Sequence, residues 1–117
     1  MINKLKILLL DNNRSRLHNS SLLIQCCGDY CIDPKSSISR HDYESNDYDV
    51  IFAHYGNKEV EESIADSDWD SGGATIVFFS GGFLTPKVKD EGFWYVSASY
   101  MEKRENICTL LKEVCEK

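Results

Sequence analysis

The sequence lacks the features of a membrane or secreted protein. None of the apolar runs in its 117 residues reaches the roughly 18 residues that a membrane span requires. The apolar run at 7–10 leads straight into DNNRSR, so the pattern of a signal peptide is missing as well. With 42% hydrophobic and 27% charged residues, the composition is that of a soluble globular domain. We therefore expect a cytoplasmic protein that does not bind membranes.

Positive charge is also scarce. The chain has 13 Lys and Arg residues against 19 Asp and Glu residues, which gives a net charge of −6. Acidic residues gather at 59–62 and 66–70. Because binding to a nucleic acid requires a positive surface that neutralises phosphates, we predict no nucleic-acid partner.

A zinc-binding pattern of cysteines is absent. No second Cys or His pair follows CCGDYC at a zinc-finger spacing, so we expect no metal and no cofactor. An odd number of cysteines without an export signal favours reduced thiols, and free cysteine behaves as a small buried hydrophobe. The sequence therefore predicts reduced cysteines, mainly in the core: Cys26, Cys27, Cys31, Cys108 and Cys115.

The apolar runs that are present indicate buried strands. KLKILLL at 4–10 and ATIVFF at 74–79 are nearly continuous, which is typical of strands buried on both faces of a parallel sheet. Further strands are predicted at 48–53 and 93–97, and a weak strand pattern lies at 30–33. Each of the clear strands ends at polar or glycine residues.

Helical patterns alternate with these strands. Asp, Asn and Asn at 11–13 can cap a helix over 14–27, and Gly28 is expected to end it with a left-handed backbone. Further helices are predicted at 57–65, weakly at 39–45, and at the C-terminus, where SYME at 99–102 has the pattern of a capping box. The last helix carries one apolar face: Met101, Ile107, Cys108, Leu111, Val114 and Cys115.

This alternation predicts a single three-layer α/β domain over residues 1–117, with a parallel sheet. In such a sheet the functional site lies at the carboxyl ends of the strands. Four polar side chains stand at strand ends: Asp11, Asn12, His54 and Ser80.

Together these positions resemble the receiver domain of bacterial two-component response regulators, a flavodoxin-like (CheY-like) fold with five parallel strands. ILLLDNN matches the first receiver strand, with Asp11 and Asn12 at the places of the family's acidic pair. DYDVIFAHYGN matches the third strand, where the family has its phospho-accepting aspartate at the position of His54.

The resemblance continues to the last strand. IVFFSGG places Ser80 at the switch Ser/Thr, and WYVSAS places Tyr95 near the family's rotating aromatic and Ala98 at its lysine. The segment 81–92 contains Pro86 and few apolar residues, so the family's fourth helix is expected to be shortened or absent.

Aspartyl phosphorylation needs a carboxylate nucleophile, a Mg²⁺ ion held by oxygen ligands, and a cation that neutralises the phosphoryl group. Here Asn12, His54 and Ala98 replace the second acid, the nucleophile and the lysine. The resemblance therefore implies a pseudo-receiver, with no catalytic residues, that regulates by binding a protein such as a sensor kinase or another regulator. Homodimerisation is a further option.

Two alternatives stay open at this stage. His54 is either a pH-sensitive or phosphate-contacting group, or a polar residue that fills the acidic pocket and bonds Asp11 or Ser80. The second open question is the function of the whole chain. The alternative to a pseudo-receiver is a small flavodoxin-like enzyme or ligand-binding protein that uses Asp11, His54 and Ser80 in a pocket. Candidate contacts with a protein partner are Trp69, Phe93 and Trp94.

Overall fold

The computed structural model describes residues 5–11, 13–36, 48–55, 74–82, 87–90 and 93–115. Within these residues one six-stranded sheet has the order β2-β1-β3-β4-β6-β5. All neighbouring strands pair in parallel except β5 and β6, which are antiparallel. The strands are β1 (Lys6–Leu10), β2 (Cys31–Lys35), β3 (Val50–His54), β4 (Thr75–Ser80), β5 (Lys87–Asp90) and β6 (Phe93–Ser97).

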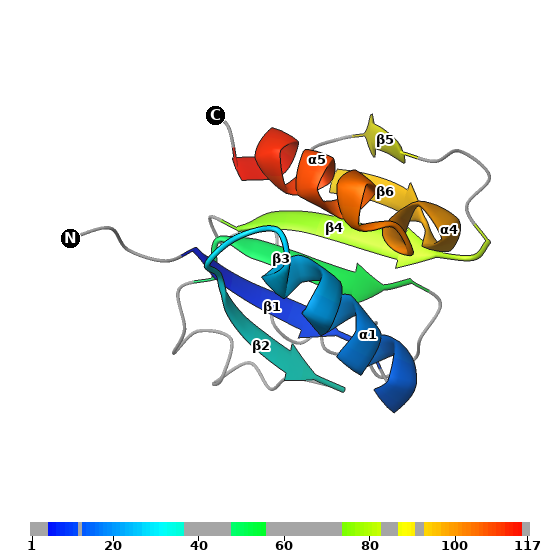
Figure 1. Ribbon diagram of the computed structural model, residues 1–117. Coiled ribbons are helices and arrows are strands. Elements are labelled where there is room, and N and C mark those ends of the chain that lie inside the picture. Colours follow the sequence, from blue (N-terminus) through cyan, green and yellow to red (C-terminus); the bar gives the residue numbers. More distant parts are fainter. Residues whose placement is uncertain are drawn as a thin grey trace.

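Three helices accompany the sheet in the described part of the chain, and all three cover the same face (Figure 1). They are α1 (Arg14–Gln25), α4 (Ala98–Met101) and α5 (Arg104–Cys115). The helices predicted at 39–45 and 57–65 lie outside the described residues. The α/β flavodoxin-like fold with its mostly parallel sheet is thus confirmed, and no helix among the described residues is long and apolar enough to cross a membrane.

The sheet is buried on both faces, which explains the continuous apolar run of β1. Ile7 and Leu9 pack toward α1 and α5, whereas Leu8 and Leu10 point to the opposite face, because successive side chains of a strand alternate. On the helix side the core is completed by Ile24 of α1 and by buried residues of α4 and α5: Met101, Ile107, Leu110, Leu111 and Val114.

The segment after β4 contains an addition to the predicted five strands. Lys87–Asp90 forms β5, which pairs with β6 at the edge of the sheet, with Val88 opposite Tyr95. A short edge strand that carries lysines is a common way to limit pairing with other chains. No helix occurs in the described parts of this segment, 81–82 and 87–90, as the sequence predicted.

The start of the last helical region differs from the prediction. Ser97, and not Ser99, is the N-cap: its backbone is extended, and its Oγ accepts a hydrogen bond from the Tyr100 N–H at 3.2 Å. The single turn α4 then ends at Met101, with Glu102 as its C-cap, and α5 starts separately at Arg104. The strand leads directly into the helix, so the cap is the last strand residue and the predicted capping box at 99–102 is wrong.

Two predictions about the end of α1 are also wrong. Gly28 does not have a left-handed backbone; a side chain there would lie 3.1 Å from the Tyr30 ring, so this glycine makes room for the ring. The expectation of reduced cysteines fails as well, because Cys27 is bonded to Cys108. Cys26 and Cys31 are free but exposed, since one follows α1 and the other lies on the edge strand β2, and the side chain of Cys115 lies outside the description.

Candidate functional site

Asp11 follows β1 at the carboxyl end of the sheet, and it is held by Arg16. Only 1% of Asp11 is exposed. Arg16 Nη2 donates to Asp11 Oδ1 at 2.7 Å, and Arg16 Nε donates to Oδ2. The Asn13 backbone N–H also donates to Oδ1, at 3.0 Å. Both carboxylate oxygens therefore already have partners within the chain.

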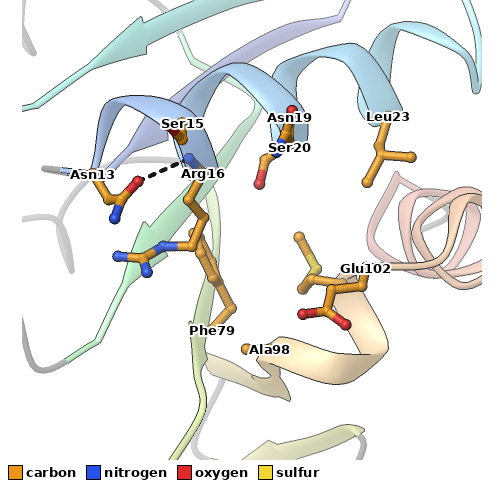
Figure 2. A pocket seen from close by; sticks show the side chains of 10 residues that line it. Asn13, Ser15, Arg16, Asn19, Ser20, Leu23, Phe79, Ala98 and Glu102 are labelled. Atoms are coloured by element: carbon orange, nitrogen blue, oxygen red, sulfur yellow. Dashed lines mark hydrogen bonds between the residues drawn. The ribbon is translucent and has the colours of Figure 1, made fainter.

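The start of α1 directs Arg16 toward Asp11. Asn13 is the N-cap, as the sequence predicted, and its Oδ1 accepts a hydrogen bond from the Arg16 backbone N–H at 2.9 Å (Figure 2). This cap fixes the first turn, from which the Arg16 side chain reaches back to the end of β1. Arg16 is not among the site residues predicted from the sequence, although an arginine in the first helical turn after an acidic strand end is a signal for such a pair.

His54 is the last residue of β3 and is half-buried. Its ring packs edge-on against Phe79, with ring centroids 5.4 Å apart. Its Nδ1 is buried, and no residue in the described part of the chain forms a hydrogen bond with it. Burial and the nearby positive charge of Arg16 lower the pKa of His54, against the opposing effect of Asp11. The imidazole is thus neutral at neutral pH.

Of the two readings of His54, the one in which it bonds Asp11 or Ser80 is therefore wrong. Asp11 is occupied by Arg16, and the Ser80 Oγ accepts from the Gly82 N–H at 3.1 Å. The strand register pairs His54 with Phe79 and not with Ser80.

The other predicted site residues separate between the two faces. Tyr95 stacks on Phe78, at 5.7 Å between ring centroids, within the core cluster on the face away from α1. Ala98 begins α4 on the helix-covered side and lines a cavity there. Asn12 lies outside the described residues.

That cavity has a volume of about 330 Å³ and lies between α1 and α4 (Figure 2). Ala98 and Arg16 both line it, so the place that the resemblance assigns to lysine is occupied by a methyl group beside open space. The full lining is Asn13, Ser15, Arg16, Asn19, Ser20, Leu23, Phe79, Ala98, Met101 and Glu102. Asp11, His54 and Ser80 do not line it.

Asp11 and His54 do not fit the Mg²⁺ ion that the resemblance to receiver domains implies. Mg²⁺ requires several oxygen ligands, but the oxygens of Asp11 are engaged by a guanidinium, and His54 offers only nitrogen. Across the described ranges no cluster of three or more His, Cys, Asp or Glu side chains could hold a metal.

The candidate partner contacts are only partly accessible. Phe93 and Trp94 are half-buried, and the Phe93 ring packs on the Phe78 ring, with 5.9 Å between the ring centroids. The ammonium groups of Lys87 and Lys89 lie 6.0 and 5.6 Å from the centre of the Trp94 ring. Trp69 lies outside the described residues.

Comparison with solved structures shows the same fold. A receiver domain from Clostridium thermocellum superposes with a TM-score of 0.68 at 15% identity, covering 94% of this chain and 93% of that one. A receiver domain protein from Bacillus halodurans gives 0.67 at 8% identity, covering 98% and 100%. The chemotaxis response regulator CheY4 of Vibrio cholerae gives 0.65 at 16% identity, covering 96% and 99%.

Similarity in sequence is much weaker than similarity in structure. No protein-family model matches the chain, and no curated protein matches it. The chain has the receiver-domain fold, and at most 16% of its residues are identical to those of the three structures compared.

Proposed function

We propose that this chain is a cytoplasmic, non-enzymatic regulatory module with a receiver fold, a pseudo-receiver that acts without phosphorylation by binding another protein. A sensor kinase or another regulator is the expected partner, with a second copy of the chain as a further option. The observation that carries this proposal is the Arg16–Asp11 pair at the carboxyl end of the sheet.

Arg16 supplies the positive charge that a metal ion would otherwise bring to this corner. A two-point bond between guanidinium and carboxylate is strong and directional. The hydrogen bonds to Asp11 raise the pKa of Arg16 above its usual value, so the cation is present at any physiological pH. A Mg²⁺ ion would have to displace this internal cation and would gain a single carboxylate.

The neighbouring positions support the same conclusion. His54 has no carboxylate to accept a phosphoryl group as the family's aspartate does. Ala98 has no charge with which to stabilise a bound phosphate. What remains is a rigid sheet whose loops and helices are free to specialise in recognition.

The test measures the binding of Mg²⁺ and beryllofluoride to the wild-type chain and to two double variants. Changes in amide chemical shifts report the binding. We expect no saturable response in the wild-type chain. The double variant Arg16→Ala, His54→Asp removes the internal cation and restores a second carboxylate, so it should bind Mg²⁺ measurably.

The matched control is the double variant Arg14→Ala, His54→Asp. Arg14 is exposed and lies in the same helical turn, so this control restores the acid but keeps the Arg16 cation. It should bind Mg²⁺ more weakly than the Arg16 variant. A saturable, Mg²⁺-dependent response to beryllofluoride in the wild-type chain at Asp11 and His54 would refute the proposal.

The alternative is a ligand-binding protein or small enzyme, and the cavity between α1 and α4 is the observation in its favour. Its volume lies at the lower end of the range for small-molecule sites. However, the three residues predicted to act there do not line it, which favours the regulatory proposal.

A further inference from the structure

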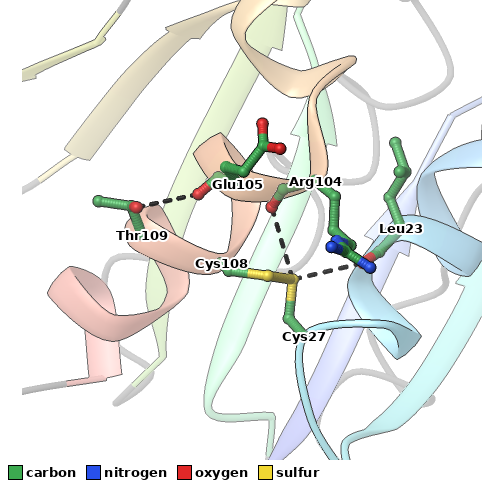
Figure 3. Close-up of a disulfide and its surroundings, with 6 residues drawn as sticks. All are labelled: Leu23, Cys27, Arg104, Glu105, Cys108 and Thr109. Carbon is green, nitrogen blue, oxygen red and sulfur yellow. Dashed lines mark hydrogen bonds between the residues drawn. A yellow bond between two sulfur atoms is a disulfide. The ribbon is translucent and has the colours of Figure 1, made fainter.

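Two cysteines 81 positions apart in the sequence meet between α1 and α5. Cys27 lies just beyond the end of α1, and Cys108 lies on α5 (Figure 3). Their Cα atoms are 5.1 Å apart, within the range that a disulfide spans without backbone movement. We propose that this pair is a reversible thiol–disulfide exchange site, whose co-reactants are low-molecular-weight disulfides and thiols of the glutathione type. This inference does not rest on the proposed function.

Reagents in solution can reach this bridge. Cys27 and Cys108 are both only half-buried, and Cys27 packs at the border of the helix-side core. Among the described side chains, Cys26 and Cys31 are free and exposed, and Cys26 is the direct sequence neighbour of Cys27. Accessibility is what distinguishes an exchangeable disulfide from one sealed in a core.

The surroundings also accommodate the reduced pair. The Cys27 Sγ lies 3.3 Å from the Leu23 carbonyl oxygen and 3.8 Å from that of Arg104 (Figure 3). In the reduced chain the Cys27 thiol can donate a hydrogen bond to either carbonyl, so this thiol has an acceptor already in place.

The packing of α5 does not depend on the bridge. Ile107, Leu111 and Val114 are buried against the sheet independently of the cysteines. We therefore expect both redox forms to be folded, which a reversible site requires. Helix α5 is already held by apolar contacts. The bridge adds a covalent link from α5 to the C-terminal end of α1.

A small disulfide oxidises the cysteine pair in two steps. A thiolate of the pair attacks one sulfur of the small disulfide, forms a mixed disulfide and releases one small thiol. The second cysteine then attacks the protein sulfur of the mixed disulfide, closes the Cys27–Cys108 bond and releases the second small thiol. Two electrons and two protons pass from the protein to the oxidant, and an excess of small thiol reverses both steps.

The experiment equilibrates the full chain in buffers with different ratios of reduced to oxidised glutathione, quenches it in acid and alkylates the remaining thiols. Peptide mass spectrometry then measures the alkylation of each cysteine. We expect Cys27 and Cys108 to lose reactivity together along one titration curve, and to regain it when the ratio is reversed. The oxidised peptides should be joined and lighter by two hydrogen atoms.

Two variants sharpen this result. In Cys108→Ser the joint loss of reactivity should vanish, whereas in Cys31→Ser, which removes an exposed free thiol, the curve should not change. Unequal curves for Cys27 and Cys108 in the wild-type chain, or no protection in any buffer, would overturn the proposal.

Circular dichroism and hydrogen exchange of the reduced chain give the second readout. We expect the secondary structure to persist, while the equilibrium constant for unfolding rises by on the order of a hundredfold, because the unfolded chain loses a long-range cross-link. Amides at the C-terminal end of α1 should exchange faster. Loss of the folded signal on reduction would show a structural disulfide and overturn the reversible site.

Discussion

The two ends of α1 are attached to the rest of the molecule by different chemistry. At the N-terminal end, Arg16 pairs with the buried carboxylate of Asp11; at the C-terminal end, Cys27 is bonded to Cys108 of α5. Between them, Ile24 packs into the apolar core. Apolar contacts hold the helix on the sheet but are not directional, whereas the two attachments at its ends select one position for it.

This comparison also separates the conditions to which each end responds. The Arg16–Asp11 attachment consists of charges beside a titratable histidine, so mutation of a charge and changes of pH act there. The disulfide responds to thiols in solution and carries no charge. Each end of α1 can therefore be perturbed without the other.

The largest effect is expected for Arg16→Met. This change leaves the Asp11 carboxylate buried without its cation, and breaking a buried pair in this way costs several kcal/mol. Because 37% of the Arg16 side chain is exposed, we expect a smaller loss, about 2–3 kcal/mol of unfolding free energy. Urea denaturation at neutral pH measures it.

The matched control is Arg14→Met on the same helical turn, where an exposed side chain changes the stability by about 0.5 kcal/mol or less. Equal stability of the two variants would mean that the Arg16–Asp11 pair does not anchor α1.

A smaller effect is expected from pH acting through His54. Burial and the charge of Arg16 lower the pKa of His54 in the folded chain below its value of 6.5 in the unfolded chain. At a pH between these two pKa values, the unfolded chain therefore binds more protons than the folded chain. This contribution to stability is therefore complete above pH 6.5 and is lost as the pH falls toward the folded pKa.

Urea midpoints measured from about pH 7 to about pH 5 test this sign. His54→Phe, which can keep the ring contact with Phe79, should flatten the dependence, and the exposed His18→Gln on α1 should leave it as in the wild-type chain. A wild-type chain that gains stability through His54 on acidification would contradict the prediction.

The smallest effect is expected at an ion pair outside α1, between Lys87 of β5 and Glu113 of α5. The hydrogen bond to Glu113, partly offset by desolvation, raises the pKa of Lys87. Both side chains are partly exposed, so Lys87→Met should cost only about 0.5 kcal/mol. The same urea assay, repeated at high salt, should show the difference shrinking; a loss as large as that of Arg16→Met would contradict the contrast between buried and exposed pairs.

Much of this architecture was predictable because it depends on local patterns. The continuous apolar run of β1 reports burial on both faces, and the polar residues at strand ends mark the carboxyl edge of the sheet. The N-cap at Asn13 followed from the same kind of reasoning. The cap at Ser97 did not, because two serines compete there and the end of the strand decides between them.

The sequence alone thus determined that strands and helices alternate, that the sheet is mostly parallel and buried, and that Asp11 and His54 stand at strand ends. Only the tertiary structure decided what those residues contact: that Arg16 turns back onto Asp11, that His54 Nδ1 faces none of the described polar groups, and that Cys27 meets Cys108. The physical reason is that periodicity reports which side of an element is buried. The choice of partner depends on how elements pack, and for the cysteines it joins residues 81 positions apart.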